Sequence, residues 1–291
     1  MFLFDSARIK LYAWLSLASQ ILIVVTGGAV RLTGSGLGCP TWPKCTTESL
    51  VNVPEQGIHG IIEFTNRLLT FALVIIALLT FITVWRLGKQ ARSGLTWLSL
   101  SAGLGIFAQA IVGGISVLTS LNPWVVGLHF VVSAALIAIS SILVWRVYAP
   151  EHAAVPYRVY ALSPFVLVAG FAALLVGVVV TGAGPHAGDA KAPRNGLDLE
   201  VLEHVHSYPA YVALGLAAVV LFTLVRVNKD ASLQLSTRIS LYLVIALLVQ
   251  AAIGIAQAKL GVPPLLVGAH MLGASIIASL LTFQWLSIRA K

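Results

Sequence analysis

The sequence predicts an all-α integral membrane protein whose eight transmembrane helices form two pseudo-symmetric four-helix bundles, at residues 1–150 and 151–291. Three observations predict this fold: 58% of the 291 residues are hydrophobic, only 10% are charged, and the chain contains eight long apolar runs. Soluble domains carry about 25% charged residues, so a chain this apolar must expose its surface to lipid. A spanning helix takes about 20 apolar residues, and eight spans leave no room for a separate soluble domain.

The eight apolar runs each have the length of a membrane-spanning helix. They cover residues 11–30, 60–85, 96–118, 124–147, 160–181, 203–227, 238–258 and 265–288. The first run is expected to remain as a helix, because it is too long for a cleaved signal peptide. An even number of crossings places both termini on the same side of the membrane.

Lysine and arginine are unequally divided between the two sides, which predicts the orientation. The side with the two long loops holds six of them: Arg31, Lys44, Arg67, Lys191, Arg194 and Lys259. The other side holds twelve: Arg8, Lys10, Arg86, Lys89, Arg92, Arg146, Arg158, Arg226, Lys229, Arg238, Arg289 and Lys291. This excess places both termini in the cytoplasm. The formal net charge of +8 therefore reflects membrane topology, and no nucleic-acid partner is expected.

Both cysteines, Cys39 and Cys45, lie in the long outer loop around residues 31–58. A disulfide persists on the outer side of a membrane, and a separation of six residues permits the bond to form. The alternative is a pair of free thiols in a polar loop.

The two halves of the chain share an internal repeat. Gln109 precedes His129 by twenty residues in the first half, and Gln250 precedes His270 by twenty residues in the second. Each repeat contains an even number of helices, so the two copies are expected to be parallel and related by an axis along the membrane normal.

Five of the seven histidines lie near the outer ends of the even-numbered runs: His59, His129, His204, His206 and His270. Ionisable side chains in membrane helices usually face the bundle interior and mark functional sites. Imidazole is a common axial ligand of haem iron, and facing helices of a bundle can hold such a cofactor. His206 with His270 is the strongest candidate pair. His204 points to a different helix face and is the alternative to His206.

The first half is less regular, because Asn66 occupies the position that matches His206. His59, Glu63 and Asn66 form one helical stripe, so His59 either supplies a ligand from further out or is an interfacial histidine. Glu63 lies about one turn into an apolar helix. It either pairs with Arg67 at i+4 or handles protons in catalysis, and we favour catalysis.

Four basic residues on the outer side are candidates for contacts with haem propionates: Arg31, Arg67, Arg194 and Lys44. Guanidinium groups suit this role because they bind carboxylates in a bidentate manner. The alternative is ordinary solvated loop charge, which is favoured for Lys44.

The segment TGGAVRLTGSGLGCPTWPKC at residues 26–45, with EFTNR at 63–67, LHF at 128–130 and GAH at 268–270, closely resembles the haem A synthase family. The resemblance extends over nearly the whole chain. It implies an eight-helix enzyme of the cytoplasmic (inner) membrane that oxidises the C8 methyl group of haem O to a formyl group. The product would be haem A for terminal oxidases. The resemblance also implies a haem b cofactor in the C-terminal bundle and the substrate, haem O, in the N-terminal bundle.

The resemblance also implies roles for particular residues. The sequence departs from the family at Asn66, where many members have a second N-terminal histidine, so either His59 or an open axial position remains for the substrate iron. Arg67 and Asn66 are expected beside the substrate haem. The family's remaining site residues fall on the haem b ligands His206 and His270, the N-terminal ligand His129, the carboxylate Glu63 and the disulfide pair Cys39 and Cys45.

Methyl oxidation requires a redox cofactor, because protein side chains alone do not perform it. The resemblance implies that haem O arrives from haem O synthase, the protohaem farnesyltransferase, and it leaves the electron-transfer partner and a homo-oligomer open. One rival function is a dihaem cytochrome b that exchanges electrons with quinone and uses the same ligand layout. A second rival is a transporter built on a parallel repeat, which would bind no haem.

Overall fold

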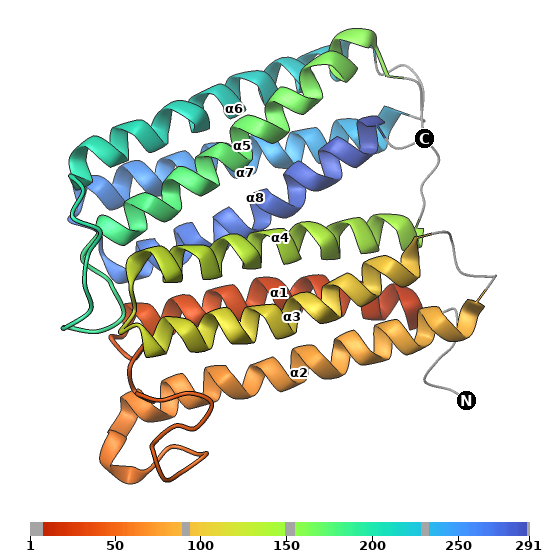
Figure 1. The fold of residues 1–291 in the computed structure, drawn as a ribbon. Coiled ribbons are helices and arrows are strands. Elements are labelled where there is room, and N and C mark those ends of the chain that lie inside the picture. Colours follow the sequence, from red (N-terminus) through yellow and green to blue (C-terminus); the bar gives the residue numbers. More distant parts are fainter. Residues whose placement is uncertain (1–7, 89–93, 149–154, 228–232, 290–291) are drawn as a thin grey trace. The chain divides into compact units, whose positions relative to one another are not determined.

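The computed structural model describes residues 8–88, 94–148, 155–227 and 233–289, and these residues form helices and loops without any strand (Figure 1). Eight of the described helices are long and apolar enough to span a membrane. They are α1 (Arg8–Leu32), α2 (Gly57–Leu87), α3 (Leu95–Leu118), α4 (Pro123–Tyr148), α5 (Tyr157–Ala183), α6 (Leu199–Val227), α7 (Gln234–Lys259) and α8 (Pro264–Arg289). A short 3₁₀ helix, η2 (Pro54–Gln56), precedes α2. The predicted all-α membrane fold is confirmed, and each predicted run lies within one helix.

The orientation in the membrane stays a prediction. Four of the cations that support it, Lys89, Arg92, Lys229 and Lys291, lie outside the described residues. The chain is a multi-pass membrane protein by the length and composition of its helices.

The described residues form two compact units, which we call the N-terminal and C-terminal units. The N-terminal unit contains residues up to 147 together with residues 178–199, and the C-terminal unit contains residues 148–177 and 200 onward. The end of α5 and the loop after it therefore group with the N-terminal unit. The division between residues 150 and 151, and the pseudo-symmetry of two bundles, stay predictions.

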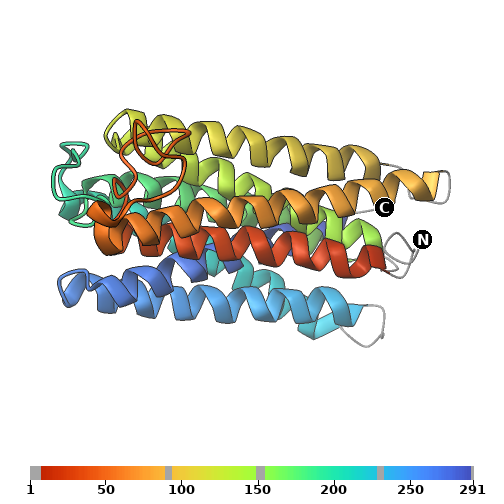
Figure 2. The same cartoon turned by 90° about the horizontal axis from the view of Figure 1, so that it is seen from below.

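Helices α1 to α4 of the N-terminal unit alternate in direction (Figures 1 and 2). Helices α2 and α4 consequently begin at the same end, and the long loop between α1 and α2 lies there. We call this the outer end of the unit, and α1 begins at the opposite, inner end. Polar contacts between helices support the packing, since the hydroxyl of Ser16 on α1 lies 3.3 Å from that of Thr80 on α2.

The C-terminal unit has an apolar core at the end where α5 begins and α6 ends. Eleven buried residues form this core: Val159, Val166, Ala217, Val220, Leu224, Leu233, Leu243, Leu247, Ile277, Leu281 and Ile288. Gln284 on α8 adds a buried hydrogen bond of 3.2 Å to the hydroxyl of Ser240 on α7. His206 and His270 lie in the first halves of α6 and α8, away from this apolar core.

The internal repeat extends to the turns that join α3 to α4 and α7 to α8. Leu121 and Val262 are both at a φ of 60°, a conformation that costs energy for residues other than glycine. Each donates its backbone N–H to a carbonyl five residues earlier, at 2.8 Å. Helices α4 and α8 then begin at Pro123 and Pro264, where proline's missing N–H is not needed. Val262 follows Leu121 by 141 positions, the same offset that separates the two prolines.

Candidate functional site

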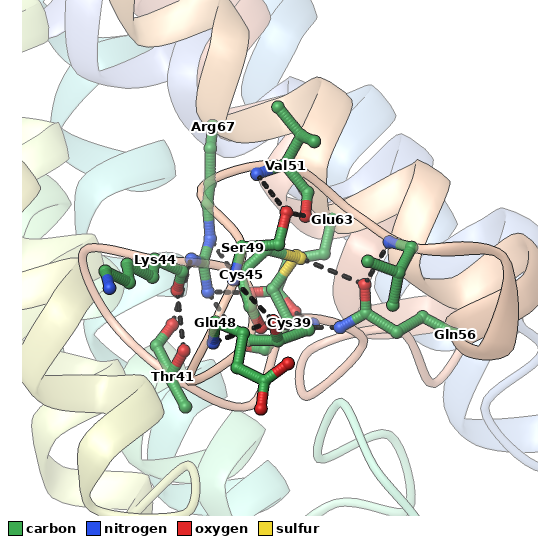
Figure 3. The surroundings of a disulfide bond; sticks show 12 residues. Cys39, Thr41, Lys44, Cys45, Glu48, Ser49, Val51, Gln56, Glu63 and Arg67 are labelled. Atoms are coloured by element: carbon green, nitrogen blue, oxygen red, sulfur yellow. Dashed lines mark hydrogen bonds and ion pairs between the residues drawn. A yellow bond between two sulfur atoms is a disulfide. The ribbon is translucent and has the colours of Figure 1, made fainter.

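The long outer loop of the N-terminal unit is closed by a disulfide between Cys39 and Cys45, as the sequence predicted (Figure 3). Both cysteines are completely buried. The ring of Trp42 lies so close to Gly114 on α3 that a Cβ atom there would collide with it. The disulfide loop is therefore anchored on α3 as well as on α2.

Glu63 on α2 is 5% exposed, and its carboxylate is held by three N–H donors (Figure 3). The backbone N–H of Cys39 donates to Oε2 at 2.6 Å. The Nε and Nη2 groups of Arg67 donate to Oε1 at 3.1 and 2.5 Å. The predicted i+4 ion pair is therefore present, and the carboxylate also connects α2 to the disulfide loop. The catalytic role of Glu63 stays a prediction.

Arg67 is occupied by the disulfide loop. Its Nη2 donates to the carbonyl of Cys39 at 2.8 Å, and its Nη1 donates to the carbonyls of Thr41 and Lys44 at 3.0 and 3.2 Å. Together with the bonds to Glu63, these contacts occupy the Nε, Nη1 and Nη2 donors of the guanidinium group. The structure thus gives Arg67 a loop-anchoring position, which sequence reasoning had missed, and contact with the substrate stays a prediction.

His59 lies at the start of α2 and is exposed. Its Nδ1 is hydrogen-bonded to the hydroxyl of Ser35 at 2.9 Å. A Cβ atom at Gly38 would collide with the carbonyl of His59, so only glycine allows the loop to approach α2 here. These contacts place His59 against the outer loop, and its role as a ligand stays a prediction.

In the C-terminal unit the structure brings His206 and His270 together from α6 and α8. Their ring centres lie 6.2 Å apart with 65° between the ring planes. His204 is exposed, and its Nδ1 bonds the carbonyl of Glu200 one turn earlier at 2.8 Å. His206, and not His204, therefore faces His270, and its role as a ligand stays a prediction.

Each of these candidate ligands faces a glycine on a neighbouring helix. A Cβ atom at Gly177 on α5 would lie 2.9 Å from Cε1 of His206, and one at Gly254 on α7 would lie 3.3 Å from Cε1 of His270. These distances are tighter than ordinary van der Waals contact. The glycines therefore make room for the imidazole rings, and a larger residue would displace them.

The N-terminal unit repeats this arrangement with one change. Gly113 on α3 faces His129 on α4, and a Cβ atom there would lie 2.9 Å from Cε1 of the ring. On α1, Gly27 faces Asn66 on α2. A Cβ atom at Gly27 would lie 4.0 Å from Nδ2 of Asn66. Asn66 thus lies against α1, and its correspondence to His206 of the C-terminal unit rests on the sequence.

Two glutamine side chains hydrogen-bond the backbone of the helix that carries a candidate histidine ligand. The Nε2 of Gln109 donates to the backbone carbonyl of His129 at 2.8 Å, and that of Gln250 donates to the carbonyl of His270 at 2.9 Å. Gln109 makes a second bond, to the hydroxyl of Ser133. The twenty-residue spacing in both halves was the sequence signal for these contacts, but it did not reveal that the bond goes to the histidine backbone.

The candidate ligands have unused polar atoms. The Nδ1 atoms of His129, His206 and His270 and the Oδ1 of Asn66 are buried without a hydrogen-bond partner among the described residues. His206 passes close to the backbone of Ala173 without forming a bond that meets normal geometry. Buried polar groups without partners are uncommon in folded proteins, so these sites are suited to polar or metal-containing ligands.

The His206–His270 geometry fits a haem iron. A metal–imidazole bond is about 2 Å long, so two imidazoles on opposite sides of one metal have ring centres about 6 Å apart, close to the observed 6.2 Å. Among the described residues, no three His, Cys, Asp or Glu side chains converge as a metal cage built from protein alone would require. Two histidines are enough for an iron whose other four ligands come from a macrocycle.

Comparison with known proteins agrees with this geometry. The family model described as "Cytochrome oxidase assembly protein" (COX15-CtaA) matches residues 10–281. A protein named heme A synthase from Alkalihalophilus pseudofirmus is 30% identical over 132 residues, and one of the same name from Bacillus cereus strain AH187 is 35% identical over 135 residues. Each alignment covers 45% of this chain and less than half of the relative, 43% and 42% respectively. The family match spans all eight helices, so the chain belongs to the COX15-CtaA family of cytochrome oxidase assembly proteins.

Proposed function

We propose that the chain is a haem A synthase, which oxidises the C8 methyl group of haem O to a formyl group and so makes haem A for terminal oxidases. One observation carries the proposal: the C-terminal unit pairs two histidines, whereas the N-terminal unit has His129 and, at the sequence position that matches His206, the amide Asn66. This difference suits a permanently bound cofactor in one unit and an exchangeable substrate in the other. The family assignment and the names of the matched relatives support this proposal over a pure electron carrier.

In this proposal His206 and His270 would hold haem b. His129 binds the iron of haem O, and Asn66 lies at the facing position, where an amide is a weak ligand. Bound haem supplies the redox chemistry that side chains lack. The glycines that face the rings and the glutamines that hold the helix backbones keep each imidazole in one orientation, which reduces the cost of binding.

We assign Glu63 as the group that handles the protons released as successive hydroxylations convert the methyl group to a geminal diol, which loses water to give the formyl group; bound haem would supply the redox chemistry. An effective proton acceptor must be held in a defined position, and three N–H donors hold this carboxylate. Arg67 then acts on Glu63 and on the disulfide loop, and both would line the outer edge of the substrate site.

We further propose that the chain lies in the cytoplasmic (inner) membrane with both termini in the cytoplasm, as the excess of inner Lys and Arg favours. Haem O is too apolar to travel freely through water, so we expect it to arrive through the bilayer from haem O synthase. A second copy of the chain could receive or pass on haem in the same way, which would give a homo-oligomer a function.

The proposal is tested by expressing the chain in cells that make haem O but no haem A. Extracted pigments resolved by chromatography should contain haem A when the wild-type chain is present. The His129→Ala variant should leave haem O unconverted while it retains haem b. Wild-type membranes that contain haem b and unconverted haem O, with the chain folded and abundant, would point to an electron carrier instead.

A further inference from the structure

Two arginines at the outer end of the N-terminal unit have no acidic partner among the described residues. Arg31 lies in the last turn of α1, and Arg194 lies in the loop between α5 and α6. Both belong to the same compact unit. The ion pair found among the described residues joins Glu63 to Arg67, so the charges of Arg31 and Arg194 are not neutralised by a carboxylate there.

The contacts of the two guanidinium groups leave donors unused. Nη2 of Arg31 donates to the carbonyl of Thr181 at 2.5 Å, whereas its Nε is buried and has no partner. Nη1 and Nη2 of Arg194 donate to the carbonyls of Ala192 and Pro185 at 2.8 and 2.5 Å. Backbone carbonyls orient both groups, but a carbonyl cannot neutralise a positive charge.

The two outer loops of the chain bring these charges together. The N–H of Gly36 donates to the carbonyl of Gly188 at 2.8 Å. Gly188 has a φ of +97°, and a Cβ atom there would lie 3.1 Å from Leu121 and 3.7 Å from Arg31. The loop after α5 therefore packs against the end of α1, and Arg194 lies close enough to Arg31 for their charges to repel. Arg31 is half-buried and Arg194 is exposed. Two like charges held close together repel each other, and an anion bound between them would offset that repulsion.

The position of Arg31 relates this pair to the ligand positions of the same unit. Gly27 and Arg31 are separated by four residues and lie on one face of α1. Gly27 faces Asn66, so Arg31 lies about one helical turn, roughly 6 Å, further out. A haem at this position would have a carboxylate-bearing edge and an apolar edge, and the carboxylates would favour the outer, more polar end.

We propose that Arg31 and Arg194 form a binding site for an anionic oxygen group, a carboxylate or a phosphate, at the outer end of the N-terminal unit. Two sources share this chemistry: a propionate of the haem bound in this unit and the headgroup of an anionic phospholipid. The propionate source rests on the proposed function, whereas the phosphate source does not. Arg67, whose guanidinium is already occupied by Glu63 and the disulfide loop, does not take part.

The first measurement compares ligands on the unmodified full-length protein in phosphatidylcholine nanodiscs. Spectroscopic titration with haem and with its dimethyl ester, which lacks both negative charges, gives the affinity for each. We expect haem to bind about tenfold more tightly, as a charged hydrogen bond contributes. Arg31→Gln and Arg194→Gln should each remove most of this difference. Lys191→Gln is the matched control, because it removes a positive charge from an exposed position in the same loop.

The second measurement is the amount of phosphatidylglycerol that copurifies with the same variants from mixed-lipid membranes. If Arg31→Gln and Arg194→Gln lower this amount and haem and its ester bind equally to the wild type, the ligand is a lipid phosphate. If both arginine variants match Lys191→Gln in both measurements, the anion site does not exist. Retention of haem b by each variant shows that it is folded, and haem A formation by the wild type tests the proposed function separately.

Discussion

The two units use the same arrangement around different ligand positions. In each unit, a glycine faces each of the two candidate ligands, and a glutamine holds the backbone of the histidine on the last helix. The C-terminal unit has His206 and His270 at these positions, whereas the N-terminal unit has Asn66 and His129. The Cys39–Cys45 loop and the long loop after α5 both group with the N-terminal unit. We infer that the C-terminal unit binds its ligand permanently, whereas the N-terminal unit binds a ligand that is exchanged.

The largest expected effect is on haem b. His206→Ala or His270→Ala removes one of the two proposed haem ligands, so we expect each variant to lose nearly all tightly bound haem b. The pyridine haemochrome content of the purified protein measures this loss. His204→Ala is the matched control, because this exposed neighbour bonds only the carbonyl of Glu200. Full haem b content and an unchanged spectrum in both ligand variants would contradict the assignment.

The next largest effect is expected for Glu63→Gln, which keeps size and hydrogen-bonding capacity but removes the charge. Loss of a general base typically lowers the rate by about 10²–10⁴-fold, so haem O or a partly oxidised alcohol should accumulate while haem b stays bound. Arg67→Gln removes the same ion pair from the other side and leaves the carboxylate. Equal haem A yields from the two variants would reduce Glu63 to a structural role.

Asn66→His should make the N-terminal unit resemble the C-terminal one. A second imidazole at this position would give the substrate iron two strong ligands, so we expect a low-spin spectrum and slower release of pigment. The exchange of bound haem O against added haem, followed by chromatography, measures the release. Asn66→Gln preserves the amide and should release pigment as the wild type does. Identical release rates in all three proteins would mean that position 66 does not face the iron.

A smaller effect is expected for the disulfide. The loop closed by Cys39 and Cys45 is short, so its replacement by two serines should cost on the order of 2 kcal/mol in unfolding free energy. Haem A formation should fall more than haem b content, because the loop carries the N–H that binds Glu63. Thermal unfolding and pigment analysis of the same sample separate the two effects. A fall in haem b that equals the fall in haem A would contradict this expectation.

The smallest expected effect concerns the glutamine that holds α7 to α8. Gln250→Leu removes one hydrogen bond to the His270 carbonyl, and such a bond contributes about 1 kcal/mol. We expect a slightly lower thermal stability of bound haem b and an unchanged spectrum type. Gln257→Leu, one to two turns further along α7, is the control, because none of the described hydrogen bonds uses its side-chain oxygen. A complete loss of haem b would show that Gln250 does more than position the helix.

The helices and the C-terminal histidine pair could be predicted from sequence, because both depend on local patterns. Long apolar runs have one structural outcome in lipid, and the repeated spacing to His129 and His270 reflects one helix hairpin used twice. The geometry of the outer loops could not be predicted in this way. Gly36 bonds Gly188, and no local pattern connects loops that are 152 positions apart.

The roles of particular polar side chains were also beyond the sequence. His59 could equally be a ligand or an interfacial residue, and only its contact with Ser35 shows where the ring lies. Arg67 could be matched to Glu63 by its i+4 spacing, but its bonds to three loop carbonyls depend on how the disulfide folds the chain back over α2.

The difference between the two units is tested most directly by electron paramagnetic resonance of the oxidised wild-type protein loaded with haem b and haem O. We predict two iron populations of different ligation: a low-spin population with two imidazoles from the C-terminal unit, and a second with one imidazole from the N-terminal unit. Asn66→His should convert the second population into the low-spin form. A single low-spin population in the wild-type protein, with both haems bound, would contradict the account.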